Sequence, residues 1–232
     1  MNGFILAKSN VLLTAIILTG LAGFNDIISD CIFLNLSTIV LIMFAFKKKY
    51  FLIIESIKDF GLKNIKKNNK FIIIYRRNNK KIENIVELKK FRKKCLLNGF
   101  KFFVANNIQL TILLKADGLY LSAHNKSYRC LFLKRSKYLI IGSAHNFSEI
   151  QYKIKQGCKH ILLSRLFKVN YDNDDTFLGI IKFNNLVRVS KKIVPLGGIN
   201  SSNLNKLKNI ISEGVALMTE IKKKPAIASR LF

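Results

Sequence analysis

Eight short apolar runs, each followed by a more polar stretch, begin at residue 50 and restrict the folds that this chain can adopt. Most of the runs lack alternation of apolar and polar residues, which is typical of strands buried on both faces of a parallel sheet. Such strands need other elements to cover both of their faces. The predicted strands are Tyr50–Ile54, Phe71–Tyr75, Phe102–Ala105, Gly118–Leu121, Tyr138–Ile141, His160–Leu163, Ile193–Leu196 and Val215–Met218.

Several of the stretches between these strands have helical periodicity. The clearest predicted helices are Ile82–Leu97, Phe147–Gln156, Leu178–Lys191 and Ser202–Ile211. Eight strands that alternate with helices predict an α/β protein with a closed parallel barrel, the (β/α)8 or TIM barrel. The units are short, so we expect a small barrel formed by residues 48–232.

Two segments near the C-terminus predict the kind of ligand that this barrel binds. The first, Ile193–Asn200, contains the paired glycines Gly197 and Gly198, and the second, Glu213–Ile221, carries Thr219 directly after its apolar run. In parallel barrels, the backbone N–H groups that follow the last two strands often hold a phosphate group. We therefore expect a phosphorylated small molecule at the glycine loop and Thr219.

The formal net charge of +27 comes from 40 lysine and arginine residues against 13 acidic residues. A nucleic-acid site would need arginines clustered with aromatic residues on one surface. Here the basic residues are mostly lysines and occur with abundant Ile, Asn and Phe, a mixture that AT-rich codons encode. We interpret the charge as lysines on solvated helix faces and expect no nucleic-acid partner.

The four cysteines are far apart and form no CxxC pair and no zinc-binding spacing. We expect buried, reduced thiols, which are typical of a cytoplasmic protein. They are Cys31, Cys95, Cys130 and Cys158.

Residues 1–47 differ in character and are predicted to be an apolar N-terminal extension. It contains two apolar runs, Val11–Phe24 and Cys31–Phe46. As helices they would be about 21 and 24 Å long, short of a hydrocarbon core of roughly 30 Å. With lysines at both ends, residues 11–46 could still form a membrane hairpin that anchors a cytoplasmic barrel to the inner face of a membrane. An extension that packs on the barrel, or an artefact of the chosen start site, is the alternative.

Short segments of the barrel resemble, in order, those of the thiamine-phosphate synthase and TenI family. No single segment is specific, but their order and spacing over residues 50–221 are hard to obtain otherwise. The matching segments are 75–76, 104–107, 116–121, 140–146, 164–167, 196–199 and 214–216.

The resemblance implies a function in thiamine biosynthesis. Synthases of this family join hydroxymethylpyrimidine diphosphate to thiazole phosphate and release diphosphate, with Mg²⁺ and a basic residue stabilising the leaving group. Arg76 stands at the position of that basic residue. The remaining positions that the resemblance assigns to substrate or phosphate binding are Asn106, Ser143, Gly197, Gly198, Met218 and Thr219.

The chain departs from the family at its metal site. Asn107 and Asn125 stand where the family has two magnesium-binding carboxylates. An amide oxygen lacks formal charge, so we expect weakened Mg²⁺ binding. Lys168 lies in the loop after the sixth strand, where the family has threonines, and could neutralise diphosphate as a point charge. The same loop has three acidic residues that either recruit a metal or are simply solvated: Asp172, Asp174 and Asp175.

His145 follows the fifth predicted strand, where the TenI branch uses a histidine for proton transfer during thiazole tautomerisation. An imidazole titrates near neutral pH and can move a proton without a metal. Alternatively, His145 only caps the following helix together with Ser143 and Asn146. We expect His124 at the same mouth of the barrel and His160 in a packed or rim position.

Three functions therefore stay open. The first is a thiamine-phosphate synthase that depends on Arg76 and Lys168, the second is a thiazole tautomerase that depends on His145, and the third is a non-catalytic binder of thiazole phosphate or thiamine phosphate.

Overall fold

The computed structural model describes residues 49–59, 70–77, 81–169, 177–200 and 202–218. All of them fall within one compact unit, Phe44–Phe232. Among these residues, no helix has the length and apolar character that a membrane span requires. The N-terminal extension with its proposed membrane hairpin, the acidic residues of the loop after the sixth strand, and Thr219 lie outside the described residues.

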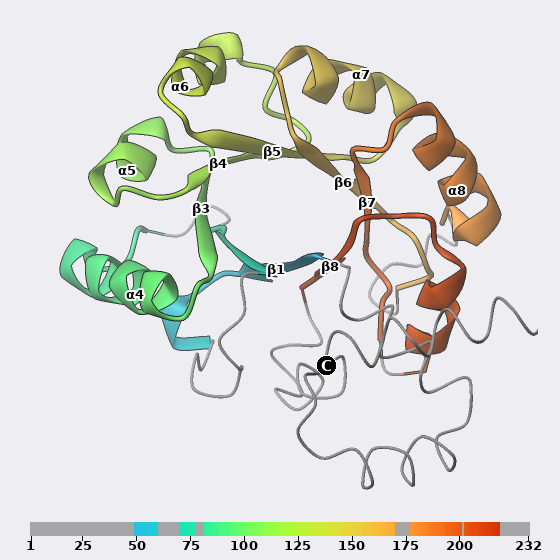
Figure 1. The fold of residues 1–232 in the computed structure, drawn as a ribbon, viewed down its shortest axis with the longest axis horizontal. Helices are drawn as coiled ribbons and strands as arrows, with labels where there is room; N and C mark the ends of the chain where they lie inside the picture. The colour runs from blue at the N-terminus through green and yellow to red at the C-terminus, as the bar shows by residue number, and fades with distance from the viewer. Residues whose placement is uncertain (1–48, 60–69, 78–80, 170–176, 201, 219–232) are drawn as a thin grey trace, which may run out of the picture. The chain divides into compact units, whose positions relative to one another are not determined.

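Eight parallel strands form a closed barrel in which each strand pairs with its neighbours in sequence, and β1 pairs with β8 (Figure 1). This confirms the predicted (β/α)8 barrel. The register is continuous around the ring, from Tyr50 beside Phe71 to Leu196 beside Ala216. The strands are β1 (Lys49–Ile54), β2 (Phe71–Tyr75), β3 (Lys101–Ala105), β4 (Gly118–Leu121), β5 (Leu139–Ala144), β6 (His160–Ser164), β7 (Ile193–Leu196) and β8 (Gly214–Leu217).

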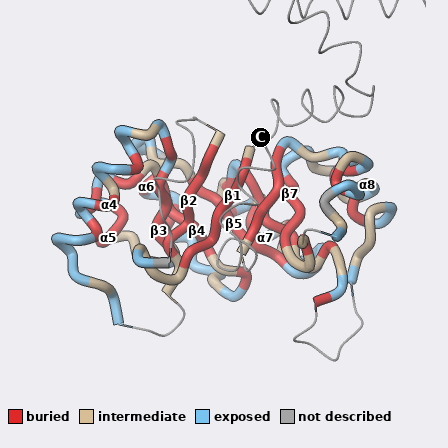
Figure 2. The backbone as a smooth tube through the Cα atoms, turned by 90° about the horizontal axis from the view of Figure 1, so that it is seen from below, coloured by how far each residue is buried: buried red, intermediate tan, exposed pale blue. Residues whose placement is uncertain are grey.

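Both faces of the strands are buried, as the uninterrupted apolar runs predict (Figure 2). Successive side chains of a strand point to opposite faces, so one set fills the barrel and the other set packs under the helices. In β1, Phe51 and Ile53 belong to the interior cluster, whereas Tyr50, Leu52 and Ile54 belong to the outer cluster.

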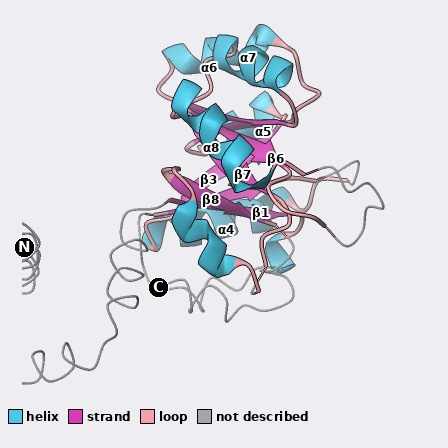
Figure 3. Cartoon of the chain, turned by 90° about the vertical axis from the view of Figure 1, so that its right-hand side faces the viewer, coloured by secondary structure: helices cyan, strands magenta, loops and turns pink. Residues whose placement is uncertain are grey.

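Helices surround the strands on the outside of the barrel (Figure 3). Three of them begin at an asparagine whose side chain accepts a hydrogen bond from a backbone N–H of the first turn: Asn84, Asn107 and Asn146. The helices are α4 (Ile85–Leu97), α5 (Ile108–Leu113), α6 (Leu131–Arg135), α7 (Phe147–Lys155) and α8 (Gly179–Val189), with short 3-10 segments η1 (Ile57–Asp59), η3 (Tyr128–Cys130) and η4 (Leu204–Asn209).

The connection after β7 differs from the prediction. The sequence predicts an α-helix over Ser202–Ile211, but the structure has the 3-10 segment η4. Asn203, at the N-terminal boundary of η4, does not cap it. Its Nδ2 donates to the carbonyl of Gly198 at 2.7 Å, and its Oδ1 accepts from the backbone N–H of Asn200 at 2.9 Å. This asparagine therefore holds the glycine loop in place of starting a regular helix.

The cysteine and His160 predictions hold for the described part of the chain. Cys95, Cys130 and Cys158 are free and buried. His160 begins β6 and is 6% exposed, with its ring edge against Phe51 at 5.3 Å between ring centroids. Burial lowers the pKa of His160 to about 4, so the ring is neutral at physiological pH. His160 is a packed residue at the amino end of its strand.

Candidate functional site

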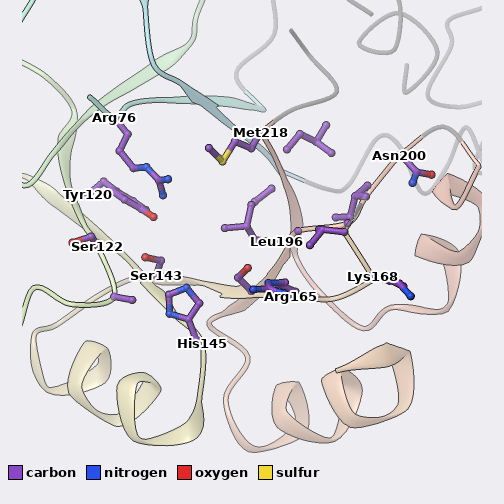
Figure 4. A pocket seen from close by; sticks show the side chains of 18 of the residues that line it. Arg76, Tyr120, Ser122, Ser143, His145, Arg165, Lys168, Leu196, Asn200 and Met218 are labelled. Carbon is purple, nitrogen blue, oxygen red and sulfur yellow. The ribbon is translucent and has the colours of Figure 1, made fainter. Parts of the chain in front are cut away.

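A cavity of about 530 Å³ opens at the carboxyl end of the barrel (Figure 4). It is lined by residues that end or follow β2, β4, β5, β6, β7 and β8. This end of a parallel barrel carries the ligand site because the connecting loops converge there. Among the residues predicted for the site, the cavity lining includes Arg76, Ser143, His145, Lys168, Gly197, Gly198 and Met218.

The charged side chains of the cavity are basic. Arg76 follows β2, and Arg165 and Lys168 follow β6. Within the described part of the chain, no aspartate or glutamate lines the cavity. The site is thus suited to a ligand with several negative charges.

Some buried polar atoms in this lining have no hydrogen-bond partner among the described residues. They include Nε of Arg76 and the hydroxyl oxygen of Tyr120. Tyr120 is fully buried in β4, and both side chains point into the cavity (Figure 4). Buried polar atoms are nearly always paired, so an unpaired phenol and guanidinium N–H in a cavity indicate groups that a ligand completes.

The glycine loop after β7 needs its glycines. Gly197 and Gly198 have φ of 90° and 69°, in the left-handed region that side chains disfavour. A Cβ at Gly198 would collide with the carbonyl oxygen of Phe167, which belongs to the loop after β6. The loops after β6 and β7 are therefore in close contact beside the cavity. Met218, directly after β8, lines the same cavity, which brings the last two connections together as the sequence predicts.

His145 follows β5 and contacts Glu149 of α7. Its backbone N–H donates to Oε2 of Glu149 at 2.7 Å, and its Nδ1 lies 3.2 Å from the same oxygen. The ring stacks on His124 with 6.0 Å between centroids. The side chain that caps α7 is Asn146, whose Oδ1 accepts from the N–H of Glu149 at 2.9 Å, so the imidazole of His145 is left to face the cavity.

The three asparagines of the predicted site do not line the cavity. Oδ1 of Asn107 accepts the N–H of Leu110 at 2.8 Å and caps α5. Asn125 accepts the N–H of Ser127 at 3.0 Å and donates to Oδ1 of Asn106 at 3.1 Å. Asn106 also exchanges two hydrogen bonds with Ser122, both at 3.0 Å. These amides shape the loops next to the cavity.

The residues that the structure describes around the cavity do not fit a magnesium ion. Mg²⁺ is usually held by one or two carboxylates together with substrate phosphates. The described residues include no cluster of three or more His, Cys, Asp or Glu side chains that could hold a metal. The oxygens of Asn107 and Asn125, at the two positions where the resemblance implies carboxylates, already accept backbone hydrogen bonds.

The sequence did not predict three residues of this region. Arg165 directly follows β6, and its place after a predicted strand is the signal that could have found it. Tyr120 lies within β4, where alternation alone does not show which residues reach the cavity. Lys153 on α7 is fully buried, and its Nζ donates to the backbone carbonyl of Ser122. Nothing in its sequence context distinguishes this lysine from the exposed ones.

Comparison with known proteins gives a family for this chain. The family model for thiamine monophosphate synthase matches residues 60–221. A thiamine-phosphate synthase of Clostridium perfringens is 29% identical over 155 residues, which cover 65% of this chain and 74% of that protein. One from Prochlorococcus marinus is 27% identical over 150 residues, which cover 63% of this chain and 43% of that protein. This chain thus matches less than half the length of the second relative.

Solved structures with the same fold include thiamine phosphate pyrophosphorylase from Pyrococcus furiosus. Its TM-score is 0.57 at 17% identity, with 80% of this chain and 97% of that chain covered. KGPDC from Streptococcus mutans reaches a TM-score of 0.55 at 10% identity, with 79% and 94% covered. At these identities the likeness shows the fold alone. The family match extends over more than half of the chain and includes all the residues that line the cavity, and this chain therefore belongs to the thiamine monophosphate synthase family.

Proposed function

We propose that this chain is a thiamine-phosphate synthase, which joins hydroxymethylpyrimidine diphosphate to thiazole phosphate. The observation that carries the proposal is the cavity at the carboxyl end of the barrel, which combines a glycine loop with three basic side chains. Two anionic groups need to be held at once in this reaction, and the cavity offers separate groups for them. The family membership supports the same chemistry.

In this proposal the thiazole phosphate lies at Gly197 and Gly198, and the diphosphate lies at Arg76, Arg165 and Lys168. The thiazole nitrogen attacks the methylene carbon of the pyrimidine, and a C–N bond forms. The C–O bond to diphosphate breaks, and its electron pair leaves with the diphosphate oxygen. Guanidinium groups stabilise the charge that develops on that oxygen, because their paired N–H donors match phosphate oxygens.

A coupled assay tests the reaction. The purified full chain is supplied with both substrates, and release of diphosphate and formation of thiamine phosphate are followed together. Arg76→Met should lower kcat/KM by about 10²–10³-fold, since one charged donor to the leaving group is lost. Arg188→Met is the matched control, because Arg188 is exposed on α8 and does not line the cavity. Thiamine phosphate binding without any product formation would indicate a non-catalytic binder.

A second candidate function is thiazole tautomerisation, which the contact between His145 and Glu149 favours. A carboxylate can only accept, so Nδ1 of His145 is the donor in this pair, and in the neutral imidazole Nε2 then carries the lone pair. An imidazole held in one tautomer at the wall of a cavity is suited to proton transfer. Incubation of the full chain with the thiazole tautomer, followed by its ultraviolet spectrum, tests this activity.

A further inference from the structure

A lysine is enclosed completely beneath one wall of the cavity. Lys153 of α7 has 0% exposure, and its Nζ donates to the backbone carbonyls of Ser122 and Asn125, both at 2.7 Å, and to Oε1 of Gln156 at 3.0 Å. Lysines almost never lie fully buried unless they are paired. This burial therefore needs a reason in the structure around it.

Burial lowers the pKa of Lys153, but its hydrogen bonds match the charged form. An ammonium has three donors, and here three oxygens surround it, whereas a neutral amine would turn a lone pair toward one of them. The orientation of the Gln156 amide is set independently, because its Nε2 donates to the carbonyls of Asn125 and Ser127 at 3.0 and 2.8 Å. Its Oε1 must therefore face the lysine.

No anion neutralises this ammonium directly. Lys153 forms no ion pair with the acidic residues that the structure describes. Glu149, on the same helix, is bonded to His145 instead. Burial raises the pKa of the nearby Cys158 to about 12 and also raises that of Cys130, so both are neutral thiols at physiological pH.

The absence of a side chain at Gly142 leaves room for the aliphatic part of Lys153. A Cβ at Gly142 of β5 would lie 2.8 Å from Cδ of Lys153 and 2.9 Å from Sγ of Cys158. Contacts this close are not found for real Cβ atoms, so any other residue at position 142 would have to displace the lysine. The buried lysine thus packs against β5, the strand that also carries the cavity residue Ser143.

The two carbonyls that Lys153 holds belong to the loop between β4 and η3. Ser122, Ala123 and His124 of this loop line the cavity. Asn125 of the same loop stands at one of the two positions where the family resemblance implies a metal carboxylate. The ammonium of Lys153 therefore holds the loop that carries Asn125, the position where the resemblance implies a metal ligand.

We propose that Lys153 is a positioning residue that replaces a divalent metal: its ammonium orders residues 122–125, and the cavity binds its diphosphate-bearing ligand without Mg²⁺. This inference rests on the proposed function. The negative charge of the ligand is met by Arg76, Arg165 and Lys168, and the ammonium behind the loop adds positive charge that Glu149 of the same helix offsets only in part.

The decisive measurement is calorimetric titration of the full chain with inorganic diphosphate, in chelator and again with Mg²⁺. Thiamine phosphate is the second probe. We expect dissociation constants that agree within about threefold between the two conditions, since no carboxylate of the described residues lines the cavity to hold the ion. Binding that requires Mg²⁺ overturns the inference and leaves the proposed function standing. An absence of binding in both conditions removes the proposed function, and the inference with it.

Lys153→Met tests the role of the ammonium, because methionine retains an unbranched apolar stem beside Gly142. The carbonyls of Ser122 and Asn125 lose their charged donor and each keep only a neutral one. We therefore expect binding of inorganic diphosphate to weaken by about ten- to a hundredfold and not to be restored by Mg²⁺. Amide hydrogen exchange at residues 122–127 should accelerate. The matched control is Lys155→Met, an exposed position on the same helix, which should retain the wild-type affinity.

A merely structural role predicts a different result. Lys153→Met would then lower the free energy of unfolding while the folded protein, at a temperature well below its Tm, bound diphosphate with unchanged affinity. That outcome refutes the positioning role. Should the variant fail to fold, the comparison of chelator and Mg²⁺ on the wild-type chain still decides whether the site works without the metal.

Discussion

Oε2 of Glu149 contacts two nitrogens of one residue, His145: it accepts the backbone N–H at 2.7 Å and lies 3.2 Å from Nδ1. The side chain of Glu149 is 20% exposed and that of His145 is 52% exposed. The carboxylate therefore holds both the backbone and the ring of a residue whose other face lines the cavity. Glu149 is a positioning residue for His145, and variants of each residue can distinguish their two roles.

If His145 transfers the proton in thiazole tautomerisation, His145→Gln should lower kcat by about 10²–10⁴-fold. Glu149→Ala should cost less, because the imidazole stays but loses its fixed tautomer. Glu149→Gln keeps an acceptor for Nδ1 and should recover most of the activity. Equal tautomerase rates in the wild type and His145→Gln would exclude this role. The rates are measured from the ultraviolet spectrum of the aromatic thiazole.

Gly198→Ala should weaken phosphate binding as well as lower the stability of the protein. Gly198 and Gly179 have the same φ of 69°, but a Cβ at Gly179 meets no atom within 4 Å, whereas one at Gly198 collides with the carbonyl of Phe167. Both alanine variants should lose about 1 kcal/mol of stability from the strained backbone. Only Gly198→Ala should also weaken binding of inorganic phosphate, measured by calorimetry. Equal phosphate affinities for the two variants would contradict a phosphate site at this loop.

Asn107 should behave as a helix cap. Asn107→Ala should lower the free energy of unfolding by about 1 kcal/mol, whereas Asn107→Asp should retain it, because a carboxylate caps equally well. Added Mg²⁺ should leave the unfolding free energy of the wild type unchanged, since a bound metal would stabilise the folded state by mass action. Urea unfolding with and without Mg²⁺ measures both effects. A rise in stability with Mg²⁺ concentration would show that the chain binds the metal.

His160 should make stability depend on pH. Burial lowers its pKa from 6.5 to about 4 in the folded state. Between these values the unfolded chain takes up a proton that the folded chain does not. The free energy of unfolding therefore falls as the pH is lowered through this window, by up to about 3 kcal/mol, and His160 contributes no pH dependence above it.

His160→Phe provides the control, because phenylalanine does not titrate and can pack against Phe51. The difference in unfolding free energy between pH 7.5 and pH 4.5 should be smaller in this variant than in the wild type. Nδ1 of His160 has no partner among the described residues, so the variant loses no hydrogen bond at this atom. An identical pH dependence of the two proteins would show that His160 titrates normally.

Strand positions were predictable because burial on both faces leaves an uninterrupted apolar run. Phe71–Tyr75 and Ile193–Leu196 have the predicted bounds. The fifth strand was predicted to end at Ile141 but continues to Ala144, because Gly142 and Ser143 are buried without being apolar. Apolar runs do not detect such positions. The short helix α5 was missed for a related reason, since six residues are too few to establish a helical period.

Composition and pattern by themselves determined the barrel, the end of the barrel at which the cavity opens, and the glycine loop, because these depend on local periodicity and on backbone freedom. Tertiary structure alone decided which side chains face one another. No local pattern distinguishes Lys153 from Lys155. Lys155 is exposed, whereas Lys153 is buried and bonded to the carbonyl of Ser122, 31 residues away in the sequence. Likewise, Asn107 caps α5 and Tyr120 lines the cavity. Such assignments depend on contacts between distant segments, which no local pattern encodes.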